Sequence, residues 1–319
     1  MPLEVKVRKR RLAVLGVSLV LVLGCGMAAY ADGPTGPASD VEAIRTETQK
    51  NSGPAGPGAE MGSESTEGTS VSGKMTEEGT TAAAQQDTAA AEGQDAGTAA
   101  GQMEQTADGR IASGGRLIDP SRPMVALTFD DGPYAPVGNR IMDCLERYNG
   151  RATFFVVGNR IPSYREEILR MKNNGHEVAN HSQDHKYLTR ISADQIRAQI
   201  EQCNQMIASV TGQSPALVRL PGGLKNTTVL ANVSQPVIMW SIDTLDWKTR
   251  NAANTVQVIL SQVRDGDIIL MHELYGASAD AVEAVVPALT EQGYQLVTVS
   301  ELAALRGGAA AGNIYSSFR

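Results

Sequence analysis

Apolar and polar residues change their pattern near residue 116, where short apolar runs begin to alternate with helical patterns. The runs are rich in β-branched and aromatic residues, so they predict strands at 124–129, 152–157, 177–179, 216–220, 237–242, 267–271 and 295–299. The segments between them favour helices at 138–148, 164–173, 192–210, 253–263 and 278–292.

The segment 192–210 illustrates how one of these helices is specified. Ser192 can cap the first turn, and Gln195, three residues later, completes a capping box. Gly212 lies just past the end, where a left-handed residue can terminate the helix. One apolar face is formed by Ile196, Ile200, Cys203 and Ile207.

Strands that alternate with helices over residues 116–305 imply parallel strands joined by helical crossovers. With about seven candidate strands, we expect an α/β fold in the form of a distorted (β/α) barrel rather than an open sheet. Each polar group with candidate chemistry lies at the C-terminal end of a predicted strand or just after it. Barrels of this kind assemble their active sites at that end.

Residues 1–31 have the pattern of an export signal. A basic segment at 6–11 precedes the apolar run 12–23, and Ala29-Tyr30-Ala31 offers a cleavage site between small residues. The alternatives are an uncleaved membrane anchor and lipidation at Cys25. All three predict that the rest of the chain is secreted or associated with the cell envelope. Any membrane contact would be made through this N-terminal segment.

Residues 32–115 consist mainly of Gly, Ala, Ser, Thr, Glu and Gln, with almost no large apolar side chains. Such a composition cannot bury enough apolar surface to offset its ordering entropy. We therefore expect a disordered low-complexity linker, which either extends the reach of the domain or is a solvated tail without a specific role. The catalytic domain is then expected at 116–305, followed by a C-terminal tail at 306–319.

The formal net charge is −7, and no basic patch with interleaved aromatic residues is present in the sequence, which argues against a nucleic-acid partner. Beyond Cys25, the chain has Cys144 and Cys203, both within amphipathic helix patterns. Buried free thiols are favoured at such positions, with a disulfide as the alternative.

Two acidic residues, Asp130 and Asp131, follow the apolar run 124–129 and precede Gly132-Pro133. Adjacent residues in a regular strand point to opposite faces, so both carboxylates can serve one site only if the strand ends here. One could then bind a metal ion while the other acts as a base. The alternative is a polar strand end that starts a turn.

The chain has four histidines. His181 and His185 share a face if their segment is helical, a spacing typical of metal ligands, or they are surface residues of a polar loop. His272 ends a buried apolar run and is either a site residue or a core imidazole with a hydrogen-bond partner. His176 precedes a predicted strand, and we interpret it as structural.

Two further strand ends carry polar groups. Arg219 could pair with a carboxylate, and Gly222 and Gly223 would leave backbone N–H groups exposed to a ligand. Asp246 could orient a histidine, and Trp247 could form an apolar wall. Each of these signals is weak on its own.

The candidate residues lie in five segments, around Asp130, His181, Arg219, Asp246 and His272. Taken together, the order and the local sequences of these segments resemble those of the polysaccharide deacetylases, also called the NodB-homology family or carbohydrate esterase family 4. The resemblance covers about residues 116–305, and its most specific motif is TFDDGP at 128–133. It implies a NodB-like barrel and a metal-dependent hydrolase that acts on non-peptide carbon–nitrogen bonds.

The resemblance also implies roles for individual residues. Asp130 resembles the catalytic base and His272 the catalytic acid, which Asp246 orients and charges. Arg219 is expected to pair with a catalytic carboxylate, and Arg151 is a second candidate for that pairing.

One divalent ion is implied on Asp131, His181 and His185. Zn²⁺ is the first choice, and Co²⁺, Ni²⁺ or Mn²⁺ also suit two histidines and a carboxylate. Trp247 and Leu270 resemble the apolar walls of the acetyl pocket.

Gly222 departs from the family pattern, which usually has a tyrosine after the proline of this segment. The backbone N–H of Gly222 could still donate a hydrogen bond to the oxyanion. The missing aromatic wall puts the sugar contacts in question.

The expected substrate is an N-acetylated polysaccharide of the cell envelope, with N-acetylglucosamine of peptidoglycan as first choice. Chitooligosaccharide and acetylxylan are alternatives within the family. A catalytically silent carbohydrate-binding wall protein is the alternative from another class. A two-metal phosphoesterase is disfavoured, because too few imidazoles remain for a second metal site. The oligomeric state stays open.

Overall fold

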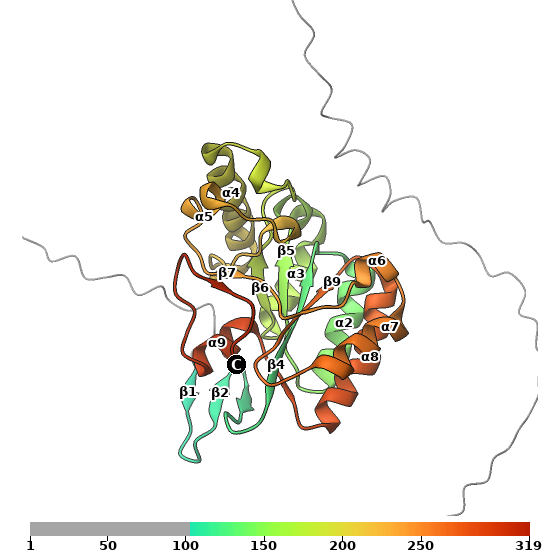
Figure 1. The fold of residues 1–319 in the computed structure, drawn as a ribbon. Coiled ribbons are helices and arrows are strands. Elements are labelled where there is room, and N and C mark those ends of the chain that lie inside the picture. Colours follow the sequence, from blue (N-terminus) through green and yellow to red (C-terminus); the bar gives the residue numbers. More distant parts are fainter. Residues whose placement is uncertain (1–102) are drawn as a thin grey trace, which may run out of the picture. The chain divides into compact units, whose positions relative to one another are not determined.

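The computed structural model describes residues 103–319, and Figure 1 shows how their helices and strands are arranged. The predicted signal segment 1–31 and residues 32–102 of the predicted linker lie outside this range. A parallel sheet forms the centre, with strands in the order β6-β5-β4-β9-β8. These strands are β4 (Met124–Asp130), β5 (Thr153–Val156), β6 (Glu177–Asn180), β8 (Ile242–Asp243) and β9 (Ile268–His272).

Residues 237–243 close this sheet into a distorted barrel. The first part of this segment, β7 (Val237–Ile238), is bridged to Val218, which is in turn bridged to Asn180 at the end of β6. The second part, β8, pairs with β9 on the other side. The expected single strand at 237–242 is therefore broken in two. The parallel α/β barrel expected from the sequence is confirmed.

Two other predicted strands are shorter in the structure. The segment 216–220 contributes only the isolated bridges of Val218. The predicted strand 295–299 reduces to β10 (Gln295–Leu296), which pairs with the first residues of β4. It ends early because Thr298 and Glu301 form a capping box that starts a helix at Val299.

Helices pack around the barrel, and Figure 1 shows α2, α7 and α8 together on one side and α4 and α5 on another. The capping box of Ser192 with Gln195 and the left-handed Gly212 delimit α4 as predicted. No helix within residues 103–319 has both the length and the apolar character needed to cross a membrane. The α-helices are α2 (Ala135–Arg147), α3 (Arg165–Asn173), α4 (Ala193–Thr211), α5 (Thr227–Ala231), α6 (Asp246–Thr249), α7 (Ala252–Gln262), α8 (Gly276–Glu291) and α9 (Val299–Leu305).

Ordered strands also lie outside the bounds of 116 and 305 that the sequence predicts for the catalytic domain. An antiparallel sheet of β1 (Glu104–Gln105), β2 (Ile111–Ser113) and β3 (Arg116–Ile118) begins inside the predicted linker. In the predicted tail, β11 (Ile314–Tyr315) pairs with β7, and Phe318 is buried in the core. Such short pairings and one buried aromatic residue leave almost no periodic pattern in the sequence.

Both cysteines of the described region are buried free thiols, in line with the favoured expectation for Cys144 and Cys203. His176 is also buried, and its Nδ1 accepts a hydrogen bond from the backbone N–H of Ala152 at 3.2 Å. Its ring lies edge-on to Phe154, with 5.6 Å between ring centroids. These contacts agree with the structural interpretation of His176.

Candidate active site

The ends of three parallel strands of the central sheet, β6, β4 and β9, bring the predicted site residues together. Asp130 is the last residue of β4 and His272 the last residue of β9, and the two are register partners. His181 follows directly after β6, the next strand but one on the other side of β4. Because the carboxyl ends of parallel strands meet at one rim of a barrel, these side chains converge there.

The two adjacent carboxylates serve one site because the strand ends between them. Asp131 has a left-handed backbone conformation with φ 69°, so the chain turns immediately after Asp130. As a result, Nε2 of His181 lies 3.6 Å from Oδ2 of Asp130 and 3.4 Å from Oδ1 of Asp131. The strand end expected from Gly132 and Pro133 is confirmed.

Asp131, His181 and His185 form a group that fits a divalent metal ion. One ligand atom from each lies within 4.8 Å of the others, and Nε2 of His185 is 3.2 Å from Oδ1 of Asp131. That carboxylate oxygen is buried and lacks a hydrogen-bond partner among residues 103–319. The Nδ1 of His181 is 2.8 Å from the carbonyl oxygen of Arg219, so it carries the proton and leaves Nε2 free as a ligand.

The loop between the two histidines is not helical, so the helical version of the prediction is wrong although the spacing is right. Ser182 and His185 both have left-handed conformations, with φ 67° and 59°. The side chain of Asn180 shapes this loop, because its Oδ1 accepts a hydrogen bond from the N–H of Ser182 at 2.7 Å. Asn180 is buried and was not predicted as a site residue.

Electrostatics within the ligand group favour an ionised Asp131 and a neutral His185. Burial opposes the charge of Asp131, but contacts with His181 and His185 outweigh it and lower the pKa of the carboxyl. Burial also lowers the pKa of His185. At His181 burial is outweighed by the contacts with Asp130 and Asp131, which raise the pKa. A carboxylate and a neutral imidazole are the forms in which these groups bind metals.

The expected pairing of Arg219 with a carboxylate is present: its partner is Asp130, and both residues are buried. Nη1 of Arg219 donates to Oδ1 of Asp130 at 2.8 Å and to Oγ1 of Thr128 at 2.7 Å. Nε and Nη2 donate to the carbonyl oxygens of Ile238 and Met239. The arginine therefore fixes one oxygen of Asp130 and leaves Oδ2 facing His181.

The guanidinium also lies over the ring of Phe155, 4.1 Å from its centroid. Arg151 was a second candidate for the pairing with a catalytic carboxylate. It instead donates to the carbonyl oxygen of Gly150 at 2.9 Å, so this candidate was wrong.

Asp246 orients His272, as predicted. Its Oδ1 lies 2.8 Å from Nδ1 of the imidazole, and its Oδ2 accepts the backbone N–H of the same histidine at 2.8 Å. The Oγ of Ser278, which sequence reasoning missed, donates to Oδ2 at 2.5 Å. Burial alone would lower the pKa of His272, but the hydrogen bond and the charge of Asp246 raise it to about 9.

The residues expected at the substrate lie near these strand ends with different exposure. Trp247 is 37% exposed and follows Asp246 in α6, whereas Leu270 is buried in β9. Gly222 is left-handed, with φ 64°, in the short 3-10 helix η3 (Pro221–Gly223). Their contacts with substrate stay predictions.

Thr128 is a further missed residue, although a polar residue inside an apolar strand is a usable signal. Its Oγ1 accepts a hydrogen bond from Arg219 and donates one to the carbonyl oxygen of Ile269 at 2.7 Å. Ser278, by contrast, gives no such signal, because it lies near the start of α8, far from Asp246 in sequence.

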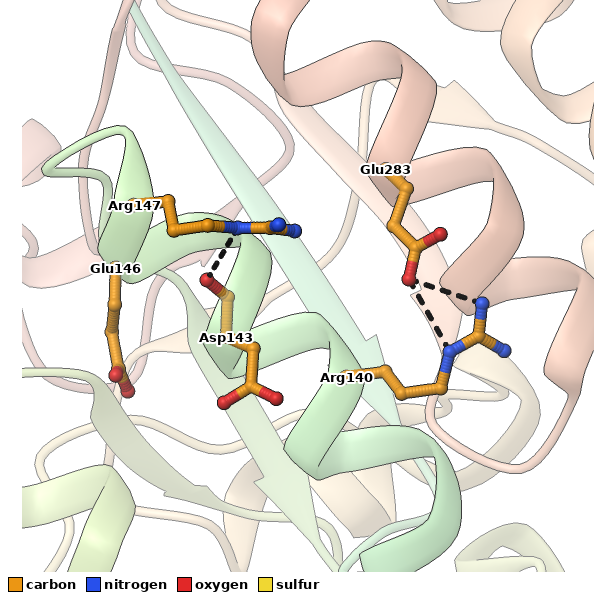
Figure 2. Close-up of a pocket in the computed structure, with 5 residues that line it drawn as sticks. All are labelled: Arg140, Asp143, Glu146, Arg147 and Glu283. Atoms are coloured by element: carbon orange, nitrogen blue, oxygen red, sulfur yellow. Dashed lines mark hydrogen bonds and ion pairs between the residues drawn. The ribbon is translucent and has the colours of Figure 1, made fainter.

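A surface hollow of about 680 Å³ is lined by residues of α2 and α8 (Figure 2), and none of the predicted site residues lines it. Its charged side chains pair with nearby groups: Arg140 binds Glu283 at 3.0 Å, and Arg147 donates to the carbonyl oxygen of Asp143 at 3.2 Å. Charges that are already compensated offer little to a ligand, so this hollow is not a candidate active site.

Known proteins resemble this chain over the same region. Residues 118–236 match the sequence profile of the polysaccharide deacetylases. The chain is 44% identical to the peptidoglycan N-acetylmuramic acid deacetylase PdaC of Bacillus subtilis over 58% of its own length and 40% of that protein. It is 30% identical to a peptidoglycan N-acetylglucosamine deacetylase of Bacillus cereus, over 56% of this chain and 87% of that protein.

A solved structure of peptidoglycan deacetylase PdaC from Bacillus subtilis matches with a TM-score of 0.58 and 43% identity, over 59% of this chain and 93% of that chain. The chain thus spans well under half the length of the full PdaC sequence but nearly all of the solved part. Sequence profile, relatives and solved structure agree, so the chain belongs to the polysaccharide deacetylase family.

Proposed function

We propose that this protein is an exported, metal-dependent deacetylase that removes N-acetyl groups from cell-envelope polysaccharide, with peptidoglycan amino sugars as the main substrate. One observation carries the proposal. A carboxylate held by arginine, Asp130, and an imidazole held by aspartate, His272, are register partners beside three metal-binding side chains. A protein that only binds carbohydrate has no chemical need for both proton-transfer groups.

Hydrolysis of an amide requires a nucleophilic water, stabilisation of the oxyanion and a proton for the leaving nitrogen. A divalent ion on Asp131, His181 and His185 would polarise the carbonyl group and lower the pKa of water. Asp130 acts as the general base through Oδ2, because Arg219 holds Oδ1. His272 is the general acid, and its raised pKa keeps it protonated at neutral pH.

The backbone N–H of Gly222 is proposed as a donor to the oxyanion. A backbone donor placed in advance stabilises the charge that develops on that oxygen, and its contribution is typically about 10²–10³-fold in rate. Trp247 and Leu270 are proposed as apolar walls for the acetyl methyl group.

Export rests on the sequence of residues 1–31, in which a basic segment precedes an apolar run and a small-residue cleavage site. Peptidoglycan is the substrate that such a location favours. The two similar deacetylases differ in the sugar that their names state, N-acetylmuramic acid or N-acetylglucosamine. Both support an N-acetylated amino sugar of peptidoglycan.

The proposal is tested by acetate release from peptidoglycan, chitooligosaccharide and acetylxylan by the Zn²⁺-loaded protein. We expect the highest rate with peptidoglycan, and we expect Asp130→Asn to abolish release from all three. Binding of these carbohydrates by metal-loaded protein without release of acetate would instead identify a silent binding protein. Faster release from acetylxylan would contradict the assignment of the substrate.

A further inference from the structure

Tyr187 is an exposed aromatic residue in direct contact with the backbone of Gly222. It lies two residues after His185 and directly before the 3-10 helix η2 (Leu188–Arg190), and it is 41% exposed. A Cβ atom at position 222 would come within 3.0 Å of Cε1 of Tyr187 and within 3.8 Å of two further ring atoms. The Cε1 edge of the ring therefore lies against Gly222, and only glycine leaves it this much room.

Two neighbouring residues restrict the ring although the ring is exposed. Leu188, the next residue, is buried in a core cluster and anchors the backbone. The guanidinium of Arg190 lies 5.1 Å from the ring centroid and holds the ring by a cation–π contact. An exposed ring that is already restricted by its neighbours loses less entropy when it binds a ligand than a free ring does.

This location lies beside the proposed reaction centre. Tyr187 is joined by two peptide bonds to a metal-binding residue, His185, and touches the residue proposed to stabilise the oxyanion, Gly222. A second exposed aromatic residue, Trp247, directly follows the aspartate that orients His272. One exposed aromatic residue thus lies beside the proposed oxyanion donor, and a second is the sequence neighbour of the residue that orients His272.

We propose that Tyr187 is a substrate-binding residue whose ring takes the apolar face of an amino-sugar ring next to the acetyl site. The C–H groups on one face of a pyranose are apolar and pack against aromatic rings, as other apolar groups do. The inference rests on the proposed function, because it needs a sugar whose acetyl group reaches Gly222. Gly222 and Tyr187 then contribute to sugar binding as one unit, because the absence of a side chain at 222 leaves room for the ring of Tyr187.

The test measures binding of a chitooligosaccharide to the Zn²⁺-loaded full chain by calorimetry, in an Asp130→Asn background that prevents turnover. Tyr187→Ala should weaken binding by about tenfold, which corresponds to about 1.4 kcal/mol. Tyr187→Phe should stay within about twofold, because the ring and not the hydroxyl group makes the contact. Tyr148→Ala removes a tyrosine of similar exposure, 42%, at the end of α2 and should have no effect.

Zn²⁺ affinity is measured in the same variants and separates sugar binding from support of the His185 loop. Unchanged Zn²⁺ affinity in Tyr187→Ala, together with weaker sugar binding, supports the inference. Equal loss of both, or unchanged sugar binding, overturns it. In the Asp130-containing protein, Tyr187→Ala should raise KM for the oligosaccharide more than it lowers kcat.

Gly222→Ala provides a second test, since its Cβ displaces the ring of Tyr187. It should weaken sugar binding when Tyr187 is present and much less in a Tyr187→Ala background, where backbone strain at 222 is the same. Additive effects of the two substitutions would contradict a shared unit. Wild-type protein that binds the sugar but releases no acetate would overturn the deacetylase function while leaving this binding result intact.

Discussion

Asp130 and His272 occupy matching positions at the ends of the adjacent parallel strands β4 and β9. A buried partner fixes each of them, Arg219 for the carboxylate and Asp246 for the imidazole. The register between two strands therefore sets the separation of the proposed base and the proposed acid. Because this register lies within a buried sheet, the two groups are held in place before any substrate arrives.

Replacement of Asp246 should change the pH dependence of catalysis. In Asp246→Asn the charge that raises the pKa of His272 to about 9 is lost, and burial then lowers that pKa. Because the acid must be protonated, activity is lost as pH rises through the pKa of His272. We expect the alkaline limb of the kcat/KM profile to move down by about one pH unit or more. An unmoved limb would contradict the pairing of Asp246 with the catalytic acid.

Arg219→Met should strongly reduce the free energy of unfolding. It leaves the buried Asp130 carboxylate unpaired, and loss of one partner of a buried ion pair costs about 3–5 kcal/mol. The matched control is Arg140→Met, which breaks exposed pairs with Asp280 and Glu283 and should cost about 0–1 kcal/mol. Urea denaturation of both variants measures the difference. Similar losses in the free energy of unfolding would show that the buried Arg219 pair stabilises the fold no more than the exposed pairs of Arg140 do.

Metal binding and proton donation should separate in two histidine variants. His181→Ala removes a ligand, so Zn²⁺ binding measured by calorimetry and acetate release should both be lost. His272→Ala should bind Zn²⁺ normally and lose about 10²–10⁴-fold in rate. Full activity in His272→Ala would show that another group protonates the leaving nitrogen.

Glu273 should make the protein less stable at alkaline pH. Burial raises the pKa of this carboxyl from 4.5 to about 8, and its Oε2 lacks a hydrogen-bond partner within the described part of the chain. Stability from the protonated form is complete below about pH 4.5 and is lost as pH rises towards about 8. Glu273→Gln keeps the acceptor for the N–H of Tyr134 and cannot ionise.

This variant should therefore be more stable than the wild type by about 1–3 kcal/mol above pH 8. The two proteins should become similar in stability towards acidic pH. Thermal unfolding across this range measures both trends. Parallel stability curves would mean that Glu273 does not titrate as its burial indicates.

Local signals in the sequence were enough to predict many elements. The limits of α4 follow from Ser192, Gln195 and Gly212, which are all close in sequence. The turn after Asp130 follows from two residues that disfavour a continuing strand. The site residues could be predicted for the same reason, because those within TFDDGP and within each of the two histidine segments are close together in sequence. Pairing between strand ends then brings these local units together.

Features that depend on distant contacts could not be read in this way. The strand 237–242 breaks because its two parts pair with different neighbours, Val218 and β9. The C-terminal tail joins the fold through β11 and Phe318, which lie in a segment made mainly of Gly, Ala and Ser. The contact of Tyr187 with Gly222 joins two loops and is visible only once both are placed.

Mass spectrometry of peptidoglycan fragments, after treatment of intact peptidoglycan with the Zn²⁺-loaded protein, tests the central claim most directly. The account predicts fragments that have lost an acetyl group from an amino sugar, together with an equal amount of free acetate. Metal-stripped protein and Asp130→Asn should leave the fragments unchanged. Fragments that keep every acetyl group after treatment with protein shown to hold its metal would contradict the account.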